Sequence, residues 1–253
     1  MQVNGKNIVI TGGAQGLGLA MAKHFADKGA SIALIDMQEE MLANAKSELG
    51  TTTGVIRTYV CNVTQEQEVE DTFNQINSDF GQIDGLVNNA GILRDGLFLK
   101  VKEGKVAKKM SLEQFQSVID VNLTGVFLCG REAANHMVNN GNKGVIINMS
   151  SVARAGNMGQ TNYAASKAGV VAMTTTWARE LGRYGIRVAA IAPGVIRTAM
   201  TDAMKPEAKE RLLKMKPVGR LGEADEIAHT ANFIFENEFV TGRVMEIDGG
   251  ITF

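Results

Sequence analysis

The chain has few of the residues that cross-link a fold or bind metals. Its 253 residues include two cysteines, three prolines, three histidines and one tryptophan. Cys61 and Cys129 lie far apart in apolar surroundings, which excludes a disulfide framework and predicts buried thiols in a reducing cytosol. His24, His136 and His229 are scattered and none has ligand spacing to a cysteine, so the sequence predicts no metal site.

Charge excess and long apolar runs are also missing. With 26 basic and 27 acidic residues the formal charge is −1, which excludes the strongly positive surface of a typical nucleic-acid binder. The first apolar run, Ile8–Ile10, is too short for a secretory signal or a membrane span. We therefore expect a cytoplasmic globular protein with no membrane contact, whose residues 1–253 form one domain.

Short β-branched runs alternate with longer segments that carry apolar residues every three or four positions. The predicted strands are Asn7–Thr11, Ser31–Asp36, Thr58–Val60, Gly85–Asn88, Gly144–Met149, Arg187–Ala192 and Arg243–Ile247. The predicted helices are Leu17–Lys28, Met37–Leu49, Glu66–Phe80, Leu112–Asn139, Asn162–Tyr184 and Ala224–Phe235. The strands are almost continuously apolar, which is typical of a parallel sheet covered on both faces. The pattern predicts an α/β fold with a doubly wound sheet.

Two segments interrupt this alternation. Leu97–Met110 contains five lysines between positions 100 and 109, and it predicts an exposed hairpin or loop rather than a nucleic-acid patch. Gly194–Gly222 is long, with a helical, amphipathic part at Thr198–Met215, and it predicts a lid.

A cluster of glycines follows the first strand. The run from Thr11 to Gly18 reads TGGAQGLG and leads directly into a helix. Glycines let the backbone approach a pyrophosphate, and a helix N-terminus offers free N–H groups. A turn with only a structural role is the alternative. Asp36, at the end of the second strand, favours a dinucleotide site because its carboxylate can accept hydrogen bonds from the hydroxyls of the dinucleotide's ribose.

Asp36 also bears on which dinucleotide binds. Its carboxylate would repel a 2′-phosphate, Gln15 is neutral, and no cation follows Asp36 before Lys46. We therefore expect NAD(H) to be preferred over NADP(H). The segment Asn88–Gly91 (NNAG) ends the fourth strand, where small residues allow a ligand to approach the backbone; a simple turn is again the alternative.

Tyr163 and Lys167 stand four residues apart on a predicted helix, so they share one face. A nearby ammonium favours the phenolate, and we expect it to lower the tyrosine pKa toward neutrality. A surface Tyr–Lys pair is the alternative. It is less favoured because the preceding strand ends in Asn148-Met149-Ser150-Ser151, with hydroxyls at the same edge of the sheet.

These motifs together resemble the short-chain dehydrogenase/reductase family. The TGxxxGxG turn, NNAG and YxxxK occur in the family's order, and the likeness extends from Asn7 to Gly250. Within the family, the chain is most similar in character to the 3-oxoacyl-[acyl-carrier-protein] reductases. The resemblance implies a Rossmann fold with a seven-stranded sheet and, commonly, a homotetramer.

The resemblance also implies a role for individual residues. Tyr163 would be the general acid or base, Lys167 would hold the nicotinamide ribose, and Asn122 would anchor a water in a proton relay. The implied cofactor contacts, in addition to Tyr163 and Lys167, are Gly12, Gln15, Gly16, Leu17, Gly18, Asp36, Asn62, Val63, Asn89, Ala90, Gly91, Pro193, Gly194, Ile196 and Thr198. The substrate would be a ketone or a secondary alcohol, most plausibly a 3-oxoacyl thioester of acyl carrier protein or coenzyme A.

The chain departs from the family pattern in three places. Spacing to Tyr163 selects Ser150 as the catalytic serine, whereas strand register selects Ser151, and we choose Ser151 because a strand fixes side-chain direction. Asn62 replaces a usual aspartate, and its carbonyl oxygen would meet the adenine amino group. Asn135–Lys143 lacks the usual basic cluster for an acidic carrier, and the Lys-rich insert could replace it.

Other functions stay open at this stage. The same machinery could oxidise a sugar, polyol or steroid alcohol, although the methionines of the lid favour an acyl chain. A catalytically inactive NAD-binding module would have lost Tyr163 or Lys167, and both are present. Surplus apolar residues on two long helices, such as Phe127 and Trp177, suit a helical interface between subunits.

Overall fold

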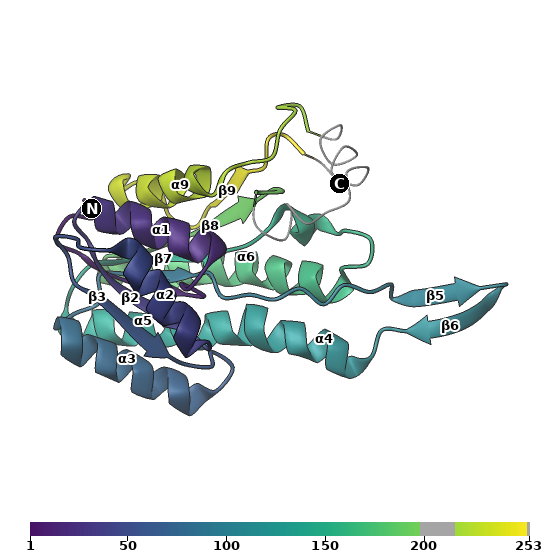
Figure 1. The fold of residues 1–253 in the computed structure, drawn as a ribbon, viewed down its shortest axis with the longest axis horizontal. Helices are drawn as coiled ribbons and strands as arrows, with labels where there is room; N and C mark the ends of the chain where they lie inside the picture. Colours follow the sequence, from purple (N-terminus) through teal and green to yellow (C-terminus); the bar gives the residue numbers. More distant parts are fainter. Residues whose placement is uncertain (198–215, 252–253) are drawn as a thin grey trace.

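Seven short strands form one sheet in which every adjacent pair is parallel. The computed structural model describes residues 1–197 and 216–251 (Figure 1). The strands are β1 (Asn7–Thr11), β2 (Ser31–Asp36), β3 (Ile56–Val60), β4 (Gly85–Asn88), β7 (Gly144–Met149), β8 (Ile186–Pro193) and β9 (Val244–Ile247). Their order in the sheet is β3-β2-β1-β4-β7-β8-β9, which confirms the predicted seven-stranded, doubly wound architecture.

Helices cover both faces of this sheet (Figure 1). They are α1 (Gly16–Asp27), α2 (Glu39–Leu49), α3 (Glu66–Phe80), α4 (Leu112–Ile119), α5 (Gly125–Asn140), α6 (Thr161–Leu181) and α9 (Ala224–Glu236). On one face α1, α2 and α9 form a core. In it the rings of Phe25 and Phe235 pack edge to face, with their centres 5.2 Å apart. On the other face α3, α5 and α6 pack around Phe73 and Cys129. Both cysteines are buried and free, and no helix of the described residues could span a membrane.

The order of the strands positions the site. β1 lies between β2 and β4. The chain adds β2 and then β3 on one side of β1, and then crosses to add β4 on the other side. Connections diverge at such a switch point and leave a crevice beyond the carboxyl ends of the strands. The turn after β1 and the segment after β4 therefore lie side by side.

The predicted helix Leu112–Asn139 is confirmed as one continuous helical segment, which contains a π-helical turn that the sequence pattern does not predict. α4 and α5 are joined by a π-helical turn, Asp120–Thr124, in which the wider spacing adds one residue to the turn. Within this turn Asn122 is fully buried, and its side chain makes hydrogen bonds to the backbone N–H and carbonyl of Ile92. A local sequence pattern does not predict these bonds. The other bounds differ from the predictions by two residues or fewer at the ends of strands and helices, except for the C-terminus of α6, where Gly182–Tyr184 is a 3₁₀ turn.

The Lys-rich insert is a β-hairpin that projects away from the body (Figure 1). Strands β5 (Leu99–Lys102) and β6 (Lys105–Lys109) pair antiparallel, and every residue in them is exposed. The connecting residues Glu103 and Gly104 both have positive φ, 50° and 74°, as a two-residue type I′ hairpin turn requires. The structure thus selects the hairpin from the two predicted possibilities.

Candidate active site

The glycine turn after β1 is closely packed and needs glycine at several positions. Gly12 has φ of +60°, and a Cβ there would lie 2.9 Å from the Ala90 Cα. A Cβ on Gly18 would lie 2.2 Å from the carbonyl oxygen of Gly12, so α1 can start this close to the turn only with glycine. Gly16 has φ of +56° and open space around it. The N-terminus of α1 consequently lies beside the crevice, which Gln15 and Leu17 line, with little side-chain bulk around it.

Hydrogen bonds join this turn to the segment after β4. The Thr11 hydroxyl oxygen accepts from the backbone N–H groups of Asn89 at 3.0 Å and Ala90 at 3.1 Å. The Asn89 amide in return donates to the carbonyl oxygens of Thr11 at 3.1 Å and Gly12 at 2.9 Å. We call these four bonds the Thr11–Asn89 clasp. It holds the two predicted cofactor-binding segments together as one wall.

Asp36 and Asn62 lie on the adjacent wall, at the ends of β2 and β3. The Asp36 carboxylate accepts from the backbone N–H of Ala14 at 3.4 Å and of Gln38 at 3.3 Å, which places it beside the glycine turn. The Asn62 side-chain oxygen already accepts from the Thr64 N–H at 3.1 Å and the Thr64 hydroxyl at 2.9 Å. Both lone pairs of that oxygen are occupied, so the expected contact with an adenine amino group finds no support in this arrangement.

Tyr163, Lys167 and Ser151 meet in the same crevice. Tyr163 and Lys167 lie on one face of α6, with the Lys167 Nζ 5.7 Å from the centre of the Tyr163 ring. The Lys167 ammonium donates to the Met149 carbonyl oxygen at 2.7 Å, so the end of β7 fixes it. The Ser151 hydroxyl lies close enough to the Tyr163 phenol to lower its pKa, and it accepts from the Ala153 N–H at 3.1 Å. The predicted Tyr–Lys pair therefore faces the crevice rather than solvent.

The two candidate serines have different surroundings. The Ser150 hydroxyl is buried and donates to the Lys167 carbonyl oxygen at 3.0 Å, so it stabilises the packing of α6 on β7. Ser151 is the serine whose hydroxyl lies at the Tyr163 phenol. The geometry favours the choice made from strand register.

Burial has the largest effect on the pKa values of this pair. It raises the pKa of the Tyr163 phenol, Ser151 lowers it by a smaller amount, and Asp95 raises it further. Burial also lowers the pKa of the Lys167 ammonium to about 8. The expectation that Lys167 lowers the Tyr163 pKa is thus wrong for the chain alone, because the ammonium is directed at Met149 and the phenol is buried. At neutral pH the phenol keeps its proton and the lysine keeps its charge.

Asn122 lies behind this group rather than in it. Its side-chain oxygen accepts from the Ile92 N–H at 2.8 Å, and its amide donates to the Ile92 carbonyl at 3.0 Å. Its amide also reaches the Ser166 hydroxyl at 3.5 Å. The structure therefore places Asn122 as a support for the segment after β4, and its part in a proton relay stays a prediction.

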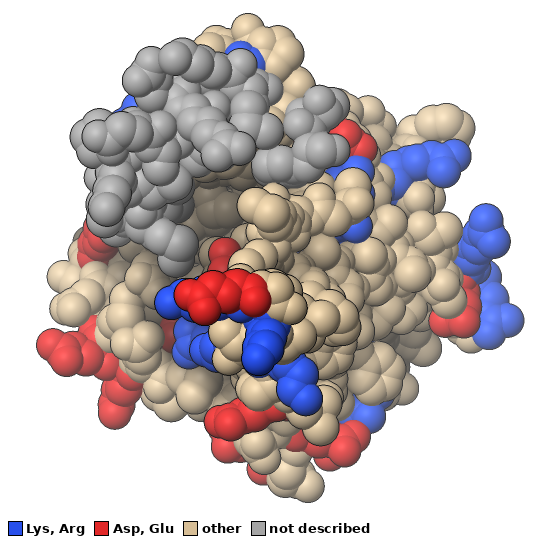
Figure 2. Space-filling model, turned by 90° about the vertical axis from the view of Figure 1, so that its right-hand side faces the viewer, with Lys and Arg blue, Asp and Glu red and all other residues tan. Residues whose placement is uncertain are grey.

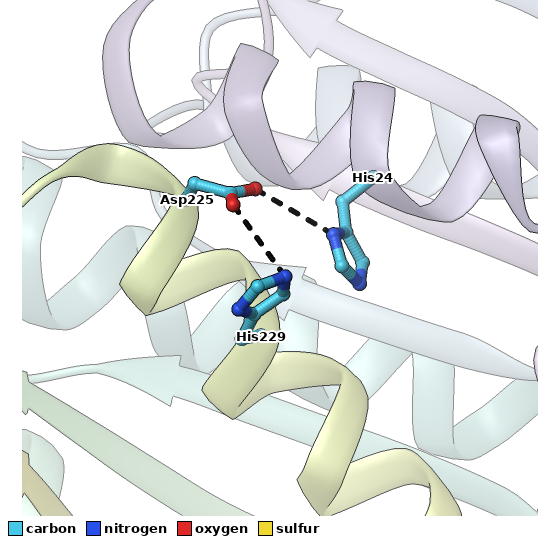
Figure 3. A group of neighbouring side chains, drawn as sticks. All are labelled: His24, Asp225 and His229. Carbon is cyan, nitrogen blue, oxygen red and sulfur yellow. Dashed lines mark ion pairs between the residues drawn. The ribbon is translucent and has the colours of Figure 1, made fainter.

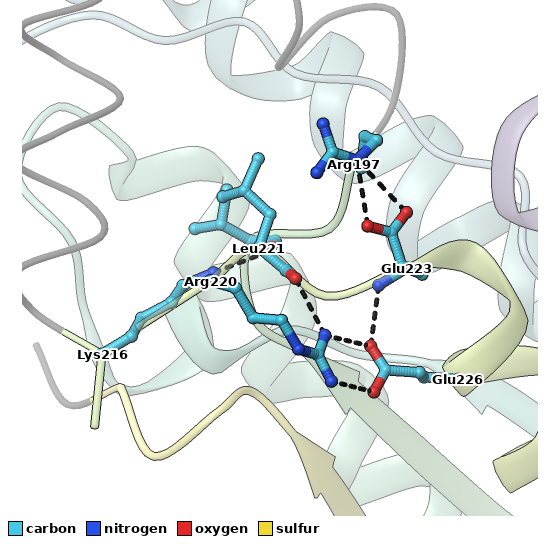
Figure 4. A network of polar contacts seen from close by, with 7 residues as sticks. Arg197, Lys216, Arg220, Leu221, Glu223 and Glu226 are labelled. Carbon is cyan, nitrogen blue, oxygen red and sulfur yellow. Dashed lines mark hydrogen bonds and ion pairs between the residues drawn. The ribbon is translucent and has the colours of Figure 1, made fainter. Parts of the chain in front are cut away.

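The segment predicted as a lid is anchored where the structure describes it. Gly194 donates its N–H to the Ile247 carbonyl at 2.9 Å, and Lys216 donates to the Val195 carbonyl at 2.7 Å. Arg197 pairs with Glu223 at 3.0 Å, while Arg220 pairs with Glu226 at 2.7 Å (Figure 4). Thr198 and the predicted helix Thr198–Met215 lie outside the described residues.

The crevice is a cleft of about 890 Å³. The predicted residues that line it are Gly12, Gln15, Leu17, Asp36, Asn62, Val63, Asn89, Ala90, Gly91, Ser151, Tyr163, Lys167, Pro193, Gly194 and Ile196. Gly16 and Gly18 shape the turn without lining the cleft. Further residues line the cleft from loops where no periodic pattern in the sequence indicates them, namely Leu93, Arg94, Asn157 and Gln160.

A parallel sheet with a glycine turn at its switch point and a Tyr–Lys helix beside it defines a Rossmann-type oxidoreductase. Comparison with known proteins agrees. Residues 12–252 match a family described as "Enoyl-(Acyl carrier protein) reductase", and the chain belongs to the short-chain dehydrogenase/reductase family of oxidoreductases.

Several curated relatives match over almost their whole length. The 3-oxoacyl-[acyl-carrier-protein] reductase of Thermotoga maritima is 42% identical, covering 99% of both chains. The Staphylococcus aureus protein of the same name is 38% identical over 97% of this chain and 98% of its own. A (2S)-[(R)-hydroxy(phenyl)methyl]succinyl-CoA dehydrogenase subunit of Thauera aromatica is also 38% identical, over 99% and 98% of the two chains.

Proposed function

We propose that this protein reduces 3-oxoacyl thioesters to 3-hydroxyacyl thioesters with NADH, with Tyr163 as the proton donor. The observation that carries the proposal is the meeting of the Tyr163 phenol, the Ser151 hydroxyl and the fixed Lys167 ammonium in the cleft that the glycine turn also lines. The relatives support the substrate class, because their names place two of them on carrier-bound 3-oxoacyl groups and one on a coenzyme A thioester.

The residues present fit a nicotinamide dinucleotide. The cradle at Gly12 and Gly18, which a Cβ would fill, allows close approach of a pyrophosphate to the N-terminus of α1. The Asp36 carboxylate would accept hydrogen bonds from the adenosine ribose hydroxyls. Its negative charge would repel the 2′-phosphate of NADPH, which supports NADH as the cofactor. Ala90, Gly91, Pro193 and Ile196 would contact the rest of the cofactor, which supplies a hydride to the carbonyl carbon of the substrate.

The chain's own groups complete the reaction. Ser151 donates a hydrogen bond to the substrate carbonyl oxygen, and Tyr163 transfers its proton to that oxygen as the alcohol forms. The raised pKa of the phenol keeps it protonated at neutral pH, which suits reduction more than oxidation. Lys167, buried in the same cleft and held by the Met149 carbonyl, would bind the nicotinamide ribose, and the phenolate that remains regains a proton from solvent. One ketone, one NADH and one proton give one alcohol and one NAD⁺.

The cleft offers apolar side chains for an acyl chain, such as Ile92, Leu93 and Val195, beside polar side chains at Arg94, Asn157 and Gln160. The names of the relatives favour an acyl thioester over a sugar or polyol. The test is a spectrophotometric assay of NADH and NADPH oxidation with acetoacetyl-coenzyme A, longer oxoacyl thioesters, and polyols in the reverse direction. We expect turnover with the thioesters and NADH. Turnover confined to polyols would instead establish the second reading, dehydrogenation of a sugar, polyol or steroid alcohol.

Tyr163→Phe distinguishes an enzyme from an inactive NAD-binding module. The variant keeps the ring and its packing but has no proton to give, so we expect kcat to fall by about 10²–10⁴ while NADH binding, followed by fluorescence, is unchanged. Equal activity of variant and wild type would remove Tyr163 from the reaction.

The hairpin has the charge to receive an acidic carrier protein. In β5 Lys100 and Lys102 alternate with apolar residues, and their cross-strand partners are Lys108 and Lys105, so four lysines share one face. The hairpin begins near the cleft: the Asp95 carboxylate accepts from the Gln160 amide at 3.0 Å, and Gln160 lines the cleft. In Figure 2, seen from the side of the hairpin, blue side chains gather in the centre of the face, below a hollow. We propose that this face docks the carrier.

The docking proposal is tested by charge reversal. Lys100→Glu combined with Lys102→Glu should lower kcat/KM for a 3-oxoacyl carrier protein at least about tenfold at low salt, while a neutral acetoacetyl-N-acetylcysteamine thioester is reduced as before. The matched control is Lys23→Glu with Lys46→Glu, two exposed lysines on α1 and α2. An equal loss on both substrates, or an equal loss in the control, would overturn the proposal.

A homotetramer and a cytoplasmic location complete the proposed function. Phe127, on α5, is 42% exposed, and Val171, Met173 and Trp177 on α6 are only partly buried, which supports a helical interface between subunits. Multi-angle light scattering should give four times the mass of one chain, and a monomer at working concentration would exclude the interface.

A further inference from the structure

Two of the three histidines come together with one aspartate on the face of the sheet covered by α1 and α9 (Figure 3). His24 lies in the last turn of α1, while Asp225 and His229 lie one turn apart at the start of α9. The His24 Nδ1 is 3.7 Å from one oxygen of Asp225, and the His229 Nε2 is 3.4 Å from the other. The histidines are scattered along the sequence, and helix packing brings two of them together with a residue about 200 positions from His24.

The spacing of these groups is close to that of a metal site. Each residue offers one ligand atom, and the three atoms lie within 4.8 Å of one another. For three atoms no more than 4.8 Å apart, a point exists that is within about 2.8 Å of each of them. Zinc bonds to imidazole nitrogen and carboxylate oxygen are shorter, about 2.0–2.2 Å. A shift of well under 1 Å in each side chain would therefore complete the site. Such shifts are small for His229 and Asp225, whose side chains are 65% and 69% exposed.

The state of His24 also suits a ligand. Its side chain is only 13% exposed, and its Nε2 atom is buried without a hydrogen-bond partner among the described residues. Because Nε2 is on the opposite side of the ring from Asp225, the atom that would bind an ion between the three residues is Nδ1 (Figure 3).

We propose that His24, Asp225 and His229 bind one divalent transition-metal ion, with zinc as the best match. Two imidazoles and one carboxylate suit zinc better than magnesium or calcium, which prefer sites built from oxygen ligands. Three protein ligands leave a fourth position for water, and the exposed side of the cluster gives that water access. None of the three residues lines the cleft, so this is a separate site.

The location suggests what the metal does. It would link α1, whose first turn forms the glycine cradle, to α9, whose start lies beside the Arg197–Glu223 and Arg220–Glu226 pairs. The bound ion would stabilise the packing of these two helices by mass action, since it binds only the folded arrangement. The alternative is a set of ion pairs without a metal, and the experiment separates the two.

The experiment measures Zn²⁺ binding by calorimetry on the full chain, freed of any affinity tag and treated with a chelator. We expect one Zn²⁺ per chain, a rise in Tm on adding Zn²⁺, and no comparable effect of Mg²⁺. His229→Ala and Asp225→Asn change exposed side chains, so the fold should persist while Kd rises at least about tenfold. Glu236→Gln, the same loss of charge at the exposed far end of α9, should bind as the wild type does.

Several outcomes would overturn the proposal. Absence of binding at 100-fold excess Zn²⁺ over protein, or binding that His229→Ala and Asp225→Asn leave unchanged, would show that the cluster holds no metal. An equal loss in Glu236→Gln would show that the charge of α9, not the ligands, attracts the ion. Because the readouts are binding and Tm, none of these results depends on the oxidoreductase activity.

Discussion

The roles of the two neighbouring serines can be separated by a pair of alanine variants. Ser150→Ala removes the hydrogen bond to the Lys167 carbonyl, and Ser151→Ala removes the bond from the Ala153 N–H and the contact with Tyr163. Each loss should cost about 1 kcal/mol of folding free energy. For a chain of this size that lowers Tm by about 2–4 °C. Stability therefore changes alike in both variants.

Activity should distinguish them. Removing a hydrogen-bond donor to the reacting oxygen costs about 10²–10³ in kcat, so we expect Ser151→Ala to lose that much and Ser150→Ala to lose less than about threefold. The assay is steady-state NADH oxidation with acetoacetyl-coenzyme A, with Tm of both variants as the control for folding. A large loss of kcat in Ser150→Ala beside an active Ser151→Ala would refute the assignment from strand register.

Three further variants test other parts of the site. Lys167→Met should raise the Tm of the chain at pH 7 relative to wild type. Burial of the ammonium lowers its pKa to about 8, so the unfolded chain holds more protons above that pH, and the difference should shrink between about pH 8 and 10.5; a difference independent of pH would contradict the burial argument. Gly18→Ala places a Cβ 2.2 Å from the Gly12 carbonyl oxygen, and should cost about 1–3 kcal/mol in stability and weaken NADH binding; chemical unfolding and fluorescence titration that match the wild type would contradict the close packing. Asp36→Ala should reduce the preference for NADH over NADPH by about tenfold, equivalent to about 1.4 kcal/mol; an unchanged ratio of kcat/KM values would exclude Asp36 as the discriminating group.

Local sequence patterns predicted the parts of this fold that depend on local regularity. The apolar strands of a parallel sheet and the amphipathic helices between them repeat with clear periods, so all seven strands were predicted within two residues. The glycine turn and the Tyr–Lys face were also predictable, because each depends on residues a few positions apart. The π-helical turn around Asn122 was not, since the bonds that Asn122 makes there go to Ile92, 30 residues earlier, and leave no trace in the local pattern.

The remaining differences arise from contacts between distant segments. The pKa of Tyr163 depends on burial, on Ser151 and on Asp95, and only the packed structure shows how these effects combine. The His24–Asp225–His229 cluster depends on α1 lying against α9. Leu93 and Arg94 line the cleft from a loop whose path no periodic pattern describes.

The Thr11–Asn89 clasp limits how the nucleotide preference of this protein can be redesigned. The Asn89 amide bonds two carbonyls of the glycine turn, and Thr11 bonds two N–H groups after β4, so each loop completes the backbone hydrogen bonding of the other. A transplanted loop without a residue equivalent to Thr11 or Asn89 would leave the recipient loop with unsatisfied backbone groups. Designers should therefore exchange the two loops as one cassette.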